Sequence, residues 1–413
     1  MKIFYNYSLT ICLLIGIAIG GLSGIILGEK TAIVQPIGDL FLHMIFVSII
    51  PLIFLSVASS IAEMEHVARL QNILKTVCVV FISTALISAI IALVGTKIYN
   101  PFQNLESINL IAHFPPALDT QARNIGGIIV NTLTVPDFPQ LFSRSSLLPL
   151  IFFSLLFGFA TSISGKKGQP IAIFLKSGTI VILRIIKIIM YGAPVGLGCY
   201  FATTVGHLGS QIIDIYLNAF LLYLLLTCIY FFGVNTIYAF ISGGKLGIKV
   251  FWSYILTPSL TALSTSSSAA CIPVNLLATK KMGVPNDIAD AIIPLGANIH
   301  KDGSVMGGMM KIIFLFTLFH KDISDPVNIA AMISASCLVG AVMGGIPSGG
   351  MTGELMICSL FGFSPDLVGI IMIMTTIIDI PATLLNSTSN TACAMMVTRF
   401  LEGKGWLLRK IKV

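Results

Sequence analysis

Long apolar stretches separated by short polar segments follow one another along almost the whole chain. Each is long enough to cross the roughly 30 Å of hydrocarbon in a bilayer as an α-helix. The pattern predicts continuous helices over residues 8–28, 33–61, 73–99, 147–163, 171–203 and 211–242. The second and fifth exceed the length needed, so we expect them to tilt or bend, the fifth around Gly192 and Pro194.

The pattern changes after residue 244. An apolar arm, "VFWSYILTPSL", leads into the hydroxyl-rich "TALSTSSSAACIP", and a second arm ends at Lys280 and Lys281. This order predicts a hairpin that enters the membrane and returns to the same side. Because its tip leaves backbone groups unpaired, the tip must be buried in protein or line a water-filled cavity. A helix over 286–318 follows and contains "ANIHKDGS".

The same order then repeats. A second hairpin has its tip at Gly344–Gly350, and a helix over 364–401 follows, which "DIPATLLNSTSNT" is expected to interrupt. A hairpin and a polar, broken helix, present twice, indicate an inverted repeat with a substrate site near the middle of the membrane. We predict an all-α polytopic membrane protein with about eight transmembrane helices and two re-entrant hairpins.

The chain is expected to form one membrane domain. Residues 1–242 would supply mostly scaffold helices, 245–401 the transport core and 402–413 a basic cytoplasmic tail. Prolines and scattered polar groups predict that 100–146 is an external excursion with short helical pieces.

Composition and charge agree with a membrane protein. Of 413 residues, 56% are apolar and 10% are charged, which is too little charge to cover a soluble protein of this size. With a cytoplasmic amino terminus, most basic clusters fall on the cytoplasmic side, as the positive-inside rule requires. The net charge of +7 is therefore a topology signal, and we expect no nucleic-acid partner. The eight cysteines show neither metal-ligand spacing nor a disulfide pattern.

Ionisable residues within the apolar stretches are the main candidates for function. Insertion scales give an aspartate at the middle of a membrane helix a cost of about 2.5–3.5 kcal/mol, so such residues normally face a partner or a cavity. His300, Lys301 and Asp302 stand side by side, and Asp379 lies in the last predicted helix. The alternative is a structural ion pair between Lys301 and one of the aspartates.

Neutral polar groups gather beside these charges. Ser266, Ser267 and Ser268 lie at the first hairpin tip, and Asn386 and Asn390 share one face of the last helix together with Thr383. We expect ligand contact at the tip. The alternatives are helix caps for the serines and polar contacts between helices for the asparagine face.

An enzyme and a channel are the alternative classes of protein. An intramembrane serine hydrolase would use Ser348 with His300 and Asp302, but "GIPSGG" is not the GxSxG nucleophile elbow. A passive channel is the second alternative, and saturable uptake with counterflow would exclude it.

The motifs resemble those of the dicarboxylate/amino acid:cation symporter family, the glutamate and aspartate transporters. The resemblance runs from "VSIIPLIFLSVASSIAEM" through "TSSSAACIPV", "PLGANIHKDGS" and "GGIPSGG" to "NTACAMMVTR". It implies a homotrimer in the plasma (inner) membrane and secondary active transport by alternating access. The implied substrate is an amino acid, acidic or small and neutral, or alternatively a dicarboxylate. No cofactor besides the coupling ion, a proton or sodium, is implied.

The resemblance also implies roles for individual residues. Asn386 and the first tip would meet the substrate carboxylate, Asp379 its amino group, and Gly345 and Pro347 of the second tip would contribute backbone contacts. The full implied substrate set is Ser266, Ser267, Ser268, Ser304, Gly345, Pro347, Asp379, Ala382, Thr383 and Asn386. The implied cation or proton set is Ser83, Thr84, His300, Lys301, Asp302, Asn386 and Asn390.

The chain departs from the family pattern at the cation sites. His300 and Lys301 replace an asparagine and a methionine, Asn390 replaces an aspartate, and Ala382 replaces the arginine that would pair with an acidic side chain. Sodium sites need several hard oxygen ligands. We therefore predict degenerate sodium sites, with Lys301 as a tethered cation beside Asp302 and His300 as a second candidate for proton transfer.

Overall fold

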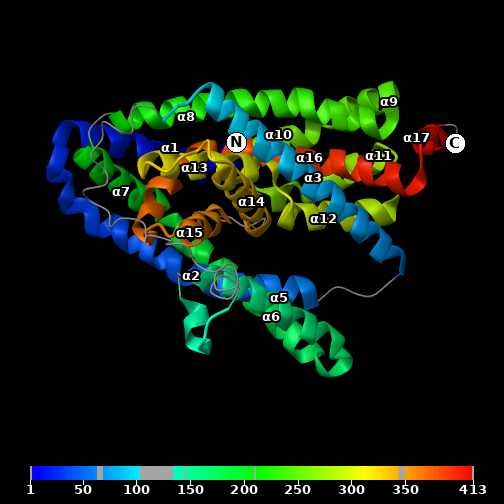
Figure 1. The fold of residues 1–413 in the computed structure, drawn as a ribbon, viewed down its shortest axis with the longest axis horizontal. Coiled ribbons are helices and arrows are strands. Elements are labelled where there is room, and N and C mark those ends of the chain that lie inside the picture. The colour runs from blue at the N-terminus through cyan, green and yellow to red at the C-terminus, as the bar shows by residue number, and fades with distance from the viewer. Residues whose placement is uncertain are drawn as a thin grey trace.

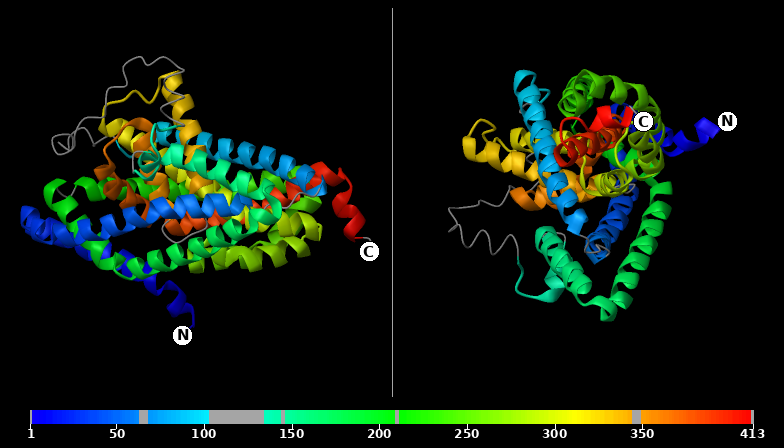
Figure 2. Two further views of the ribbon diagram at one scale, coloured as in Figure 1. Left: turned by 90° about the horizontal axis from the view of Figure 1, so that it is seen from below. Right: turned by 90° about the vertical axis from the view of Figure 1, so that its right-hand side faces the viewer.

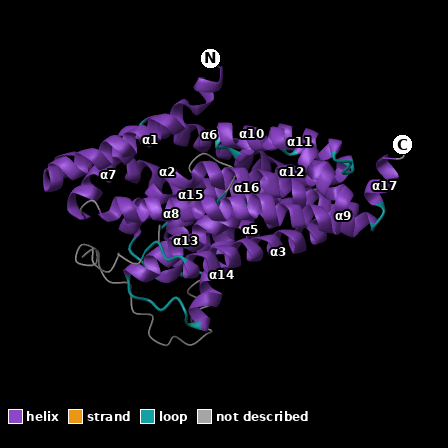
Figure 3. Cartoon of the chain, turned by 90° about the horizontal axis from the view of Figure 1, so that it is seen from above, coloured by secondary structure: helices purple, strands orange, loops and turns teal. Residues whose placement is uncertain are grey.

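The computed structural model describes residues 2–62, 68–102, 134–143, 146–208, 211–343 and 349–411. Within these ranges the chain forms helices and connecting loops and contains no strand (Figures 1 and 3). The segment 100–146 was expected to be an external excursion with short helical pieces. Its described part contains one short 3₁₀ helix, Phe138–Phe142. Residues 103–133 lie outside the described ranges.

The six predicted continuous helices are present. They are α1 (Lys2–Leu27), α2 (Gln35–Ala62), α3 (Ala68–Ile98), α5 (Leu147–Ile163), the pair α6 (Gln169–Tyr191) and α7 (Ala193–Leu208), and α8 (Gln211–Cys228), which continues through a π-helical turn into α9 (Asn235–Tyr254). By length and apolar composition, four described helical spans could cross a membrane, and the α6–α7 pair would add a fifth.

The predicted bend at Gly192 is confirmed, because α6 and α7 meet there at 58°. Beyond the bend, α7 packs closely along α1. Side chains at Gly16 and Gly20 of α1 would collide with the backbone at Pro194 and Gly198 of α7, so glycine permits the close approach. On one side of the molecule, α5 and α6 pack against α2 (Figures 1 and 2).

Both predicted hairpins have helical arms. The first consists of α10 (Leu256–Thr265) and α11 (Ser268–Lys281), and the chain reverses at Ser266, whose φ of 46° is left-handed. The second consists of α14 (Pro326–Val342) and α15 (Gly349–Phe361); residues 344–348 of its tip lie outside the described ranges.

The helix predicted over 286–318 is broken as expected. It forms α12 (Asn286–Ile299) and α13 (Asp302–Leu318), and His300 and Lys301 connect them in non-helical conformations. The matching break predicted in the last helix is wrong. Helix α16 (Val368–Glu402) runs for 35 residues straight through Pro381. A proline removes one backbone donor, and Thr388 and Asn390 bond carbonyls of their own helix without opening it.

The core of the molecule lies around α13 and α16. Helix α13 packs against α3, α14 and α16, and α16 also packs against α9, both arms of the first hairpin and α12 (Figure 1). Every residue of α13 except Thr317 is buried. Large apolar side chains are exposed on the outer helices, as a lipid-facing surface requires, among them Ile19, Val79, Phe174 and Phe232.

Candidate functional site

The candidate site is built around the break between α12 and α13. Hydroxyls from two other helices bond backbone carbonyls in the first turn of α13, directly after the break. Ser88 of α3 donates to the Asp302 carbonyl at 2.6 Å, and Tyr223 of α8 donates to the Gly303 carbonyl at 2.8 Å. The break is thereby held in place by two helices distant in sequence.

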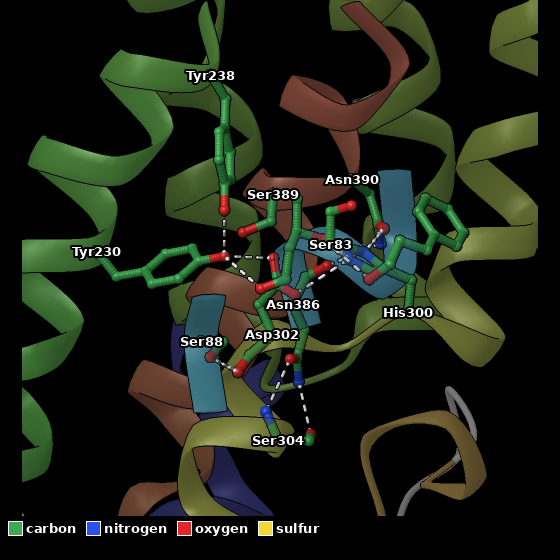
Figure 4. A network of polar contacts seen from close by, with 12 residues as sticks. Ser83, Ser88, Tyr230, Tyr238, His300, Asp302, Ser304, Asn386, Ser389 and Asn390 are labelled. Atoms are coloured by element: carbon green, nitrogen blue, oxygen red, sulfur yellow. Dashed lines mark hydrogen bonds and ion pairs between the residues drawn. The ribbon is translucent and has the colours of Figure 1, made fainter. Parts of the chain in front are cut away.

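His300 lies at the centre of this break, 2% exposed (Figure 4). Its Nδ1 is 2.7 Å from Asn390 Oδ1 on α16, and its Nε2 is 2.6 Å from Thr84 Oγ1 on α3. The imidazole also stacks on the ring of Phe81, with centroids 4.1 Å apart. Three residues on two helices, α3 and α16, therefore fix both the position and the rotation of the ring.

The hydrogen bonds define where the imidazole carries its protons. Asn390 donates its amide to the Asn386 carbonyl at 2.8 Å, so its Oδ1 faces His300 and Nδ1 must be the donor. At Nε2, Thr84 has two options because its hydroxyl also lies 3.1 Å from the Phe81 carbonyl. It donates to a neutral ring, or accepts from a protonated ring while donating to Phe81. Both protonation states are satisfied in the same geometry.

Asp302 is the acidic partner of His300 and is fully buried. Its Oδ2 accepts from Tyr230 at 2.8 Å, and Tyr230 lies 3.2 Å from the hydroxyl of Tyr238 (Figure 4). Its Oδ1 lies 3.1 Å from His300 Nε2, at ion-pair distance but without hydrogen-bond geometry. The carboxylate therefore faces an imidazole on one side and a tyrosine on the other.

A second group of contacts joins the break to α16. The Ser304 backbone donates to Asn386 Oδ1 at 3.1 Å, and the Asn386 amide donates to Ser304 Oγ at 3.0 Å. Gly303 packs so closely on the backbone of Ala382 that a side chain there would collide with it. Thr383, the next residue, is buried. The structure thus brings Ser304, Ala382 and Asn386 together.

Lys301 is buried at the same break. The carboxylate whose charge acts on it is Asp379 of α16, one turn before Thr383. The contact that the structure gives Asp302 within this segment is that of His300, and the placement of Lys301 beside Asp302 stays a prediction. His300 and Lys301 adopt non-helical backbone, and Asp302 begins α13.

A buried ion pair adjoins Asp379 and was missed by the sequence reasoning. Lys311 of α13 lies 2.7 Å from Glu354 of α15, and both are at most 1% exposed. Thr375 of α16 accepts from Lys311 at 2.8 Å and donates to Glu354. A lone lysine and a lone glutamate within apolar helices were signals for this pair.

The remaining predicted residues lie at or beyond the edge of this cluster. In the first tip, Ser267 caps α11 by accepting from Ala270, and Ser268 is buried. Ser266 is left with a buried hydroxyl that has no partner among the described residues. Asn275 of α11 ties this hairpin to Ser387 of α16 at 2.8 Å.

Three other predictions have different outcomes. The Ser83 hydroxyl is exposed and donates within its own helix to Val79, whereas its neighbour Thr84 faces the site. Gly345 and Pro347, and the rejected nucleophile Ser348, lie outside the described residues.

The oxygen atoms around the His300 ring indicate which ion the space between them could bind. Oxygen atoms of Thr84, Asp302 and Asn390 converge there, as for a hard cation. The imidazole occupies the space between them and contacts all three. A sodium ion would have to displace the ring, whereas a proton can add to Nε2 without moving any of these groups.

Comparison with known proteins gives consistent matches over nearly the whole chain. The model of the sodium:dicarboxylate symporter family matches residues 9–400. A proton/sodium-glutamate symport protein of Bacillus caldotenax is 25% identical over 98% of this chain and 96% of its own length. A C4-dicarboxylate transport protein of Rhizobium leguminosarum is 28% identical over 82% of this chain and 77% of its own length.

These matches agree with the buried polar centre and the apolar exterior. They exclude the hydrolase alternative, because the family consists of transporters and not of enzymes. An integral protein of the plasma membrane with a small-molecule substrate follows from the same matches. The chain belongs to the sodium:dicarboxylate symporter family.

Proposed function

We propose that this protein is a secondary transporter that carries a small carboxylate substrate together with a proton, independently of sodium. The observation that carries the proposal is the position of His300. Its ring fills the space between Thr84, Asp302 and Asn390, and it has a satisfied hydrogen-bond arrangement both with and without a proton on Nε2.

The substrate is an anion with at least one carboxylate. Relatives named for glutamate and for C4-dicarboxylates support this class. The reciprocal Asn386–Ser304 bonds fix an amide and a hydroxyl between α16, which also carries Asp379, and the start of α13, which Lys301 precedes; such a set is able to receive a carboxylate and, for an amino acid, its ammonium group. Because Ala382 cannot pair with a side-chain carboxylate, Lys301 is the candidate for that role, and small neutral amino acids remain in the test panel.

For the whole molecule we propose a homotrimer with both termini in the cytoplasm. Residues 1–242 supply mostly the scaffold, and the hairpins with α12, α13 and α16 form the core that alternates between the two sides. The basic clusters at the ends of the predicted spans support this orientation. Native mass spectrometry of the detergent-solubilised protein tests the assembly, with three copies of the 44.2 kDa chain expected.

The test of transport is counterflow in proteoliposomes. Vesicles loaded with unlabelled glutamate, aspartate, succinate, malate, alanine or serine are diluted into a trace of the labelled compound, without sodium. We expect labelled substrate to accumulate for one of the dicarboxylic compounds and uptake to saturate.

The matched variants compare two asparagines. Asn386→Ala removes the contact to Ser304 and should lower counterflow by about tenfold or more, since two buried hydrogen bonds are lost. Asn298→Ala, an exposed asparagine that bonds only its own helix, should leave it unchanged. Absence of counterflow for every compound, or a requirement for sodium, would refute the proposal.

A further inference from the structure

A π-helical turn, Ile229–Val234, joins α8 to α9 and sets the directions of two tyrosine side chains. Tyr230 and Tyr238 are eight residues apart, which in an uninterrupted α-helix would rotate them apart by about 80°. Each π-helical hydrogen bond spans one residue more than an α-helical one. The turn therefore takes up an extra residue and brings both side chains to nearly the same face, where their hydroxyls lie 3.2 Å apart (Figure 4).

The two hydroxyls form a chain that ends on the carboxylate of the proposed proton site. Tyr230 donates its one hydroxyl hydrogen to Asp302 Oδ2 at 2.8 Å, and the other acceptor within reach, the Thr84 carbonyl, is 3.5 Å away. Tyr238 is then the donor to Tyr230. Asp302 Oδ1 lies 3.1 Å from His300 Nε2. Both tyrosines are buried, so the chain is shielded from lipid and solvent along its length.

The other side chains around Asp302 do not extend this chain. On α3, Thr84 and Ser88 are neutral, and Ser88 bonds the Asp302 backbone and not its carboxylate. The thiols of Cys337 on α14 and Cys393 on α16 interact with Asp302 electrostatically. A thiol is a weak hydrogen-bond donor and acceptor. The tyrosine pair is therefore the hydrogen-bonded path that the described residues provide from this carboxylate.

The far end of the path lies toward the C-terminal end of the chain. Ser242, one turn after Tyr238, donates to the Tyr238 carbonyl at 2.7 Å. The Ser242 carbonyl accepts from the indole of Trp406 at 2.8 Å, in the short helix α17 (Trp406–Ile411) (Figure 1). Helix α9 is kinked immediately after Ser242. In the proposed orientation this end is cytoplasmic, so Tyr238 lies between the proton site and the cytoplasm.

We propose that Tyr230 and Tyr238 conduct the transported proton from Asp302 to the cytoplasmic end of the core, and that the π-helical turn serves to align them. The inference rests on the proposed function and deepens it by naming the path on which the proton is released. A purely structural pair would stabilise the Asp302 carboxylate without moving a proton.

The release step conserves every proton. His300 gives its Nε2 proton to Asp302 Oδ1, and rotation of the carboxyl group brings the protonated oxygen to Tyr230. The Tyr230 oxygen accepts this proton while its own hydroxyl proton passes to Tyr238, which passes its own to water. Each tyrosine forms one O–H bond and breaks one. Rotation of both hydroxyls then restores the arrangement in which Tyr230 donates to the ionised carboxylate.

Tyr238→Phe tests the path because it removes a hydroxyl that bonds Tyr230 and leaves the Tyr230–Asp302 bond in place. Counterflow needs no release of the proton, because proton and substrate can return together, whereas net uptake requires it. In sodium-free vesicles, net uptake of labelled aspartate or succinate and the accompanying acidification should fall by about tenfold or more, while counterflow stays within about threefold. Tyr230→Phe also removes the donor to Asp302, so both activities should fall by about tenfold or more.

Tyr216→Phe is the matched control. It also removes a buried tyrosine hydroxyl, one that donates to the Ile370 carbonyl at 3.0 Å, outside the proton site. Its ratio of net uptake to counterflow should equal that of the wild type, even if the loss of a hydrogen bond lowers the yield of folded protein.

A wild-type ratio of net uptake to counterflow in Tyr238→Phe, or a loss of counterflow as large as that of net uptake, would overturn the inference. Should Tyr238→Phe not yield monodisperse protein, the wild type in deuterated water decides, since deuterium slows proton transfer. Net uptake should then slow more than counterflow, and equal slowing would overturn the inference. Counterflow absent from the wild type refutes the proposed function itself.

Discussion

The residue that best explains this site is His300. The sequence alone identified His300, Lys301, Asp302 and Asp379, because ionisable residues in apolar stretches are rare and costly. It could not assign their partners. Which side chain faces Asp302 depends on the backbone of the break, and only the folded arrangement places His300 there.

Replacing the imidazole by oxygen ligands should change the coupling ion. His300→Asn combined with Asn390→Asp removes the ring and adds a carboxylate beside Thr84 and Asp302, which supplies the hard oxygen atoms that sodium prefers. We expect sodium to stimulate uptake by this variant by about tenfold or more, whereas the wild type shows no stimulation. The measurement is uptake of labelled aspartate and succinate against sodium concentration.

The control for this prediction is His43→Asn, an exposed histidine near the beginning of α2, which should behave as the wild type. A double variant that remains unaffected by sodium while still showing counterflow would contradict the assignment of the cation position to His300.

At the scale of elements, apolar lengths and turn residues predicted most of the helices, the bend at Gly192 and the arms of both hairpins. The predicted break in α16 failed for a physical reason. One proline and several hydroxyls do not open a helix that neighbouring elements surround, whereas beside the break at His300 and Lys301 hydroxyls of two other helices bond the first carbonyls of α13. The signal for a break was therefore present in both helices, and only tertiary contacts distinguished them.

The packing of α12 on α16 carries its own prediction. Gly296 faces the side chain of Asn390 so closely that an added methyl group would collide with it. Gly296→Ala should therefore displace Asn390 from His300 and reduce uptake by about tenfold or more, since overpacking typically costs 1–3 kcal/mol. Uptake and the thermal unfolding midpoint are measured together.

Gly233→Ala is the matched control, because nothing lies near the position of its added methyl group. It should leave uptake and the unfolding midpoint unchanged. Normal uptake in Gly296→Ala would show that the His300–Asn390 contact is not needed for transport.

At the scale of the whole molecule, the outer helices present apolar side chains suited to lipid, and the polar residues of the candidate site are buried in the centre. Composition predicted the first, and the broken helix α12–α13 predicted the second. The buried charges of the centre include two pairs, His300 with Asp302 and Lys311 with Glu354, and the proposed function assigns the transported proton to the first.

The most direct test follows the pH inside sodium-free proteoliposomes while aspartate or succinate is added outside. With a pH-sensitive dye trapped in the lumen, the account predicts acidification that accompanies net uptake, and uptake that rises as the outer pH is lowered, because the proton enters with the substrate. Uptake that requires a sodium gradient and leaves the internal pH unchanged would contradict it.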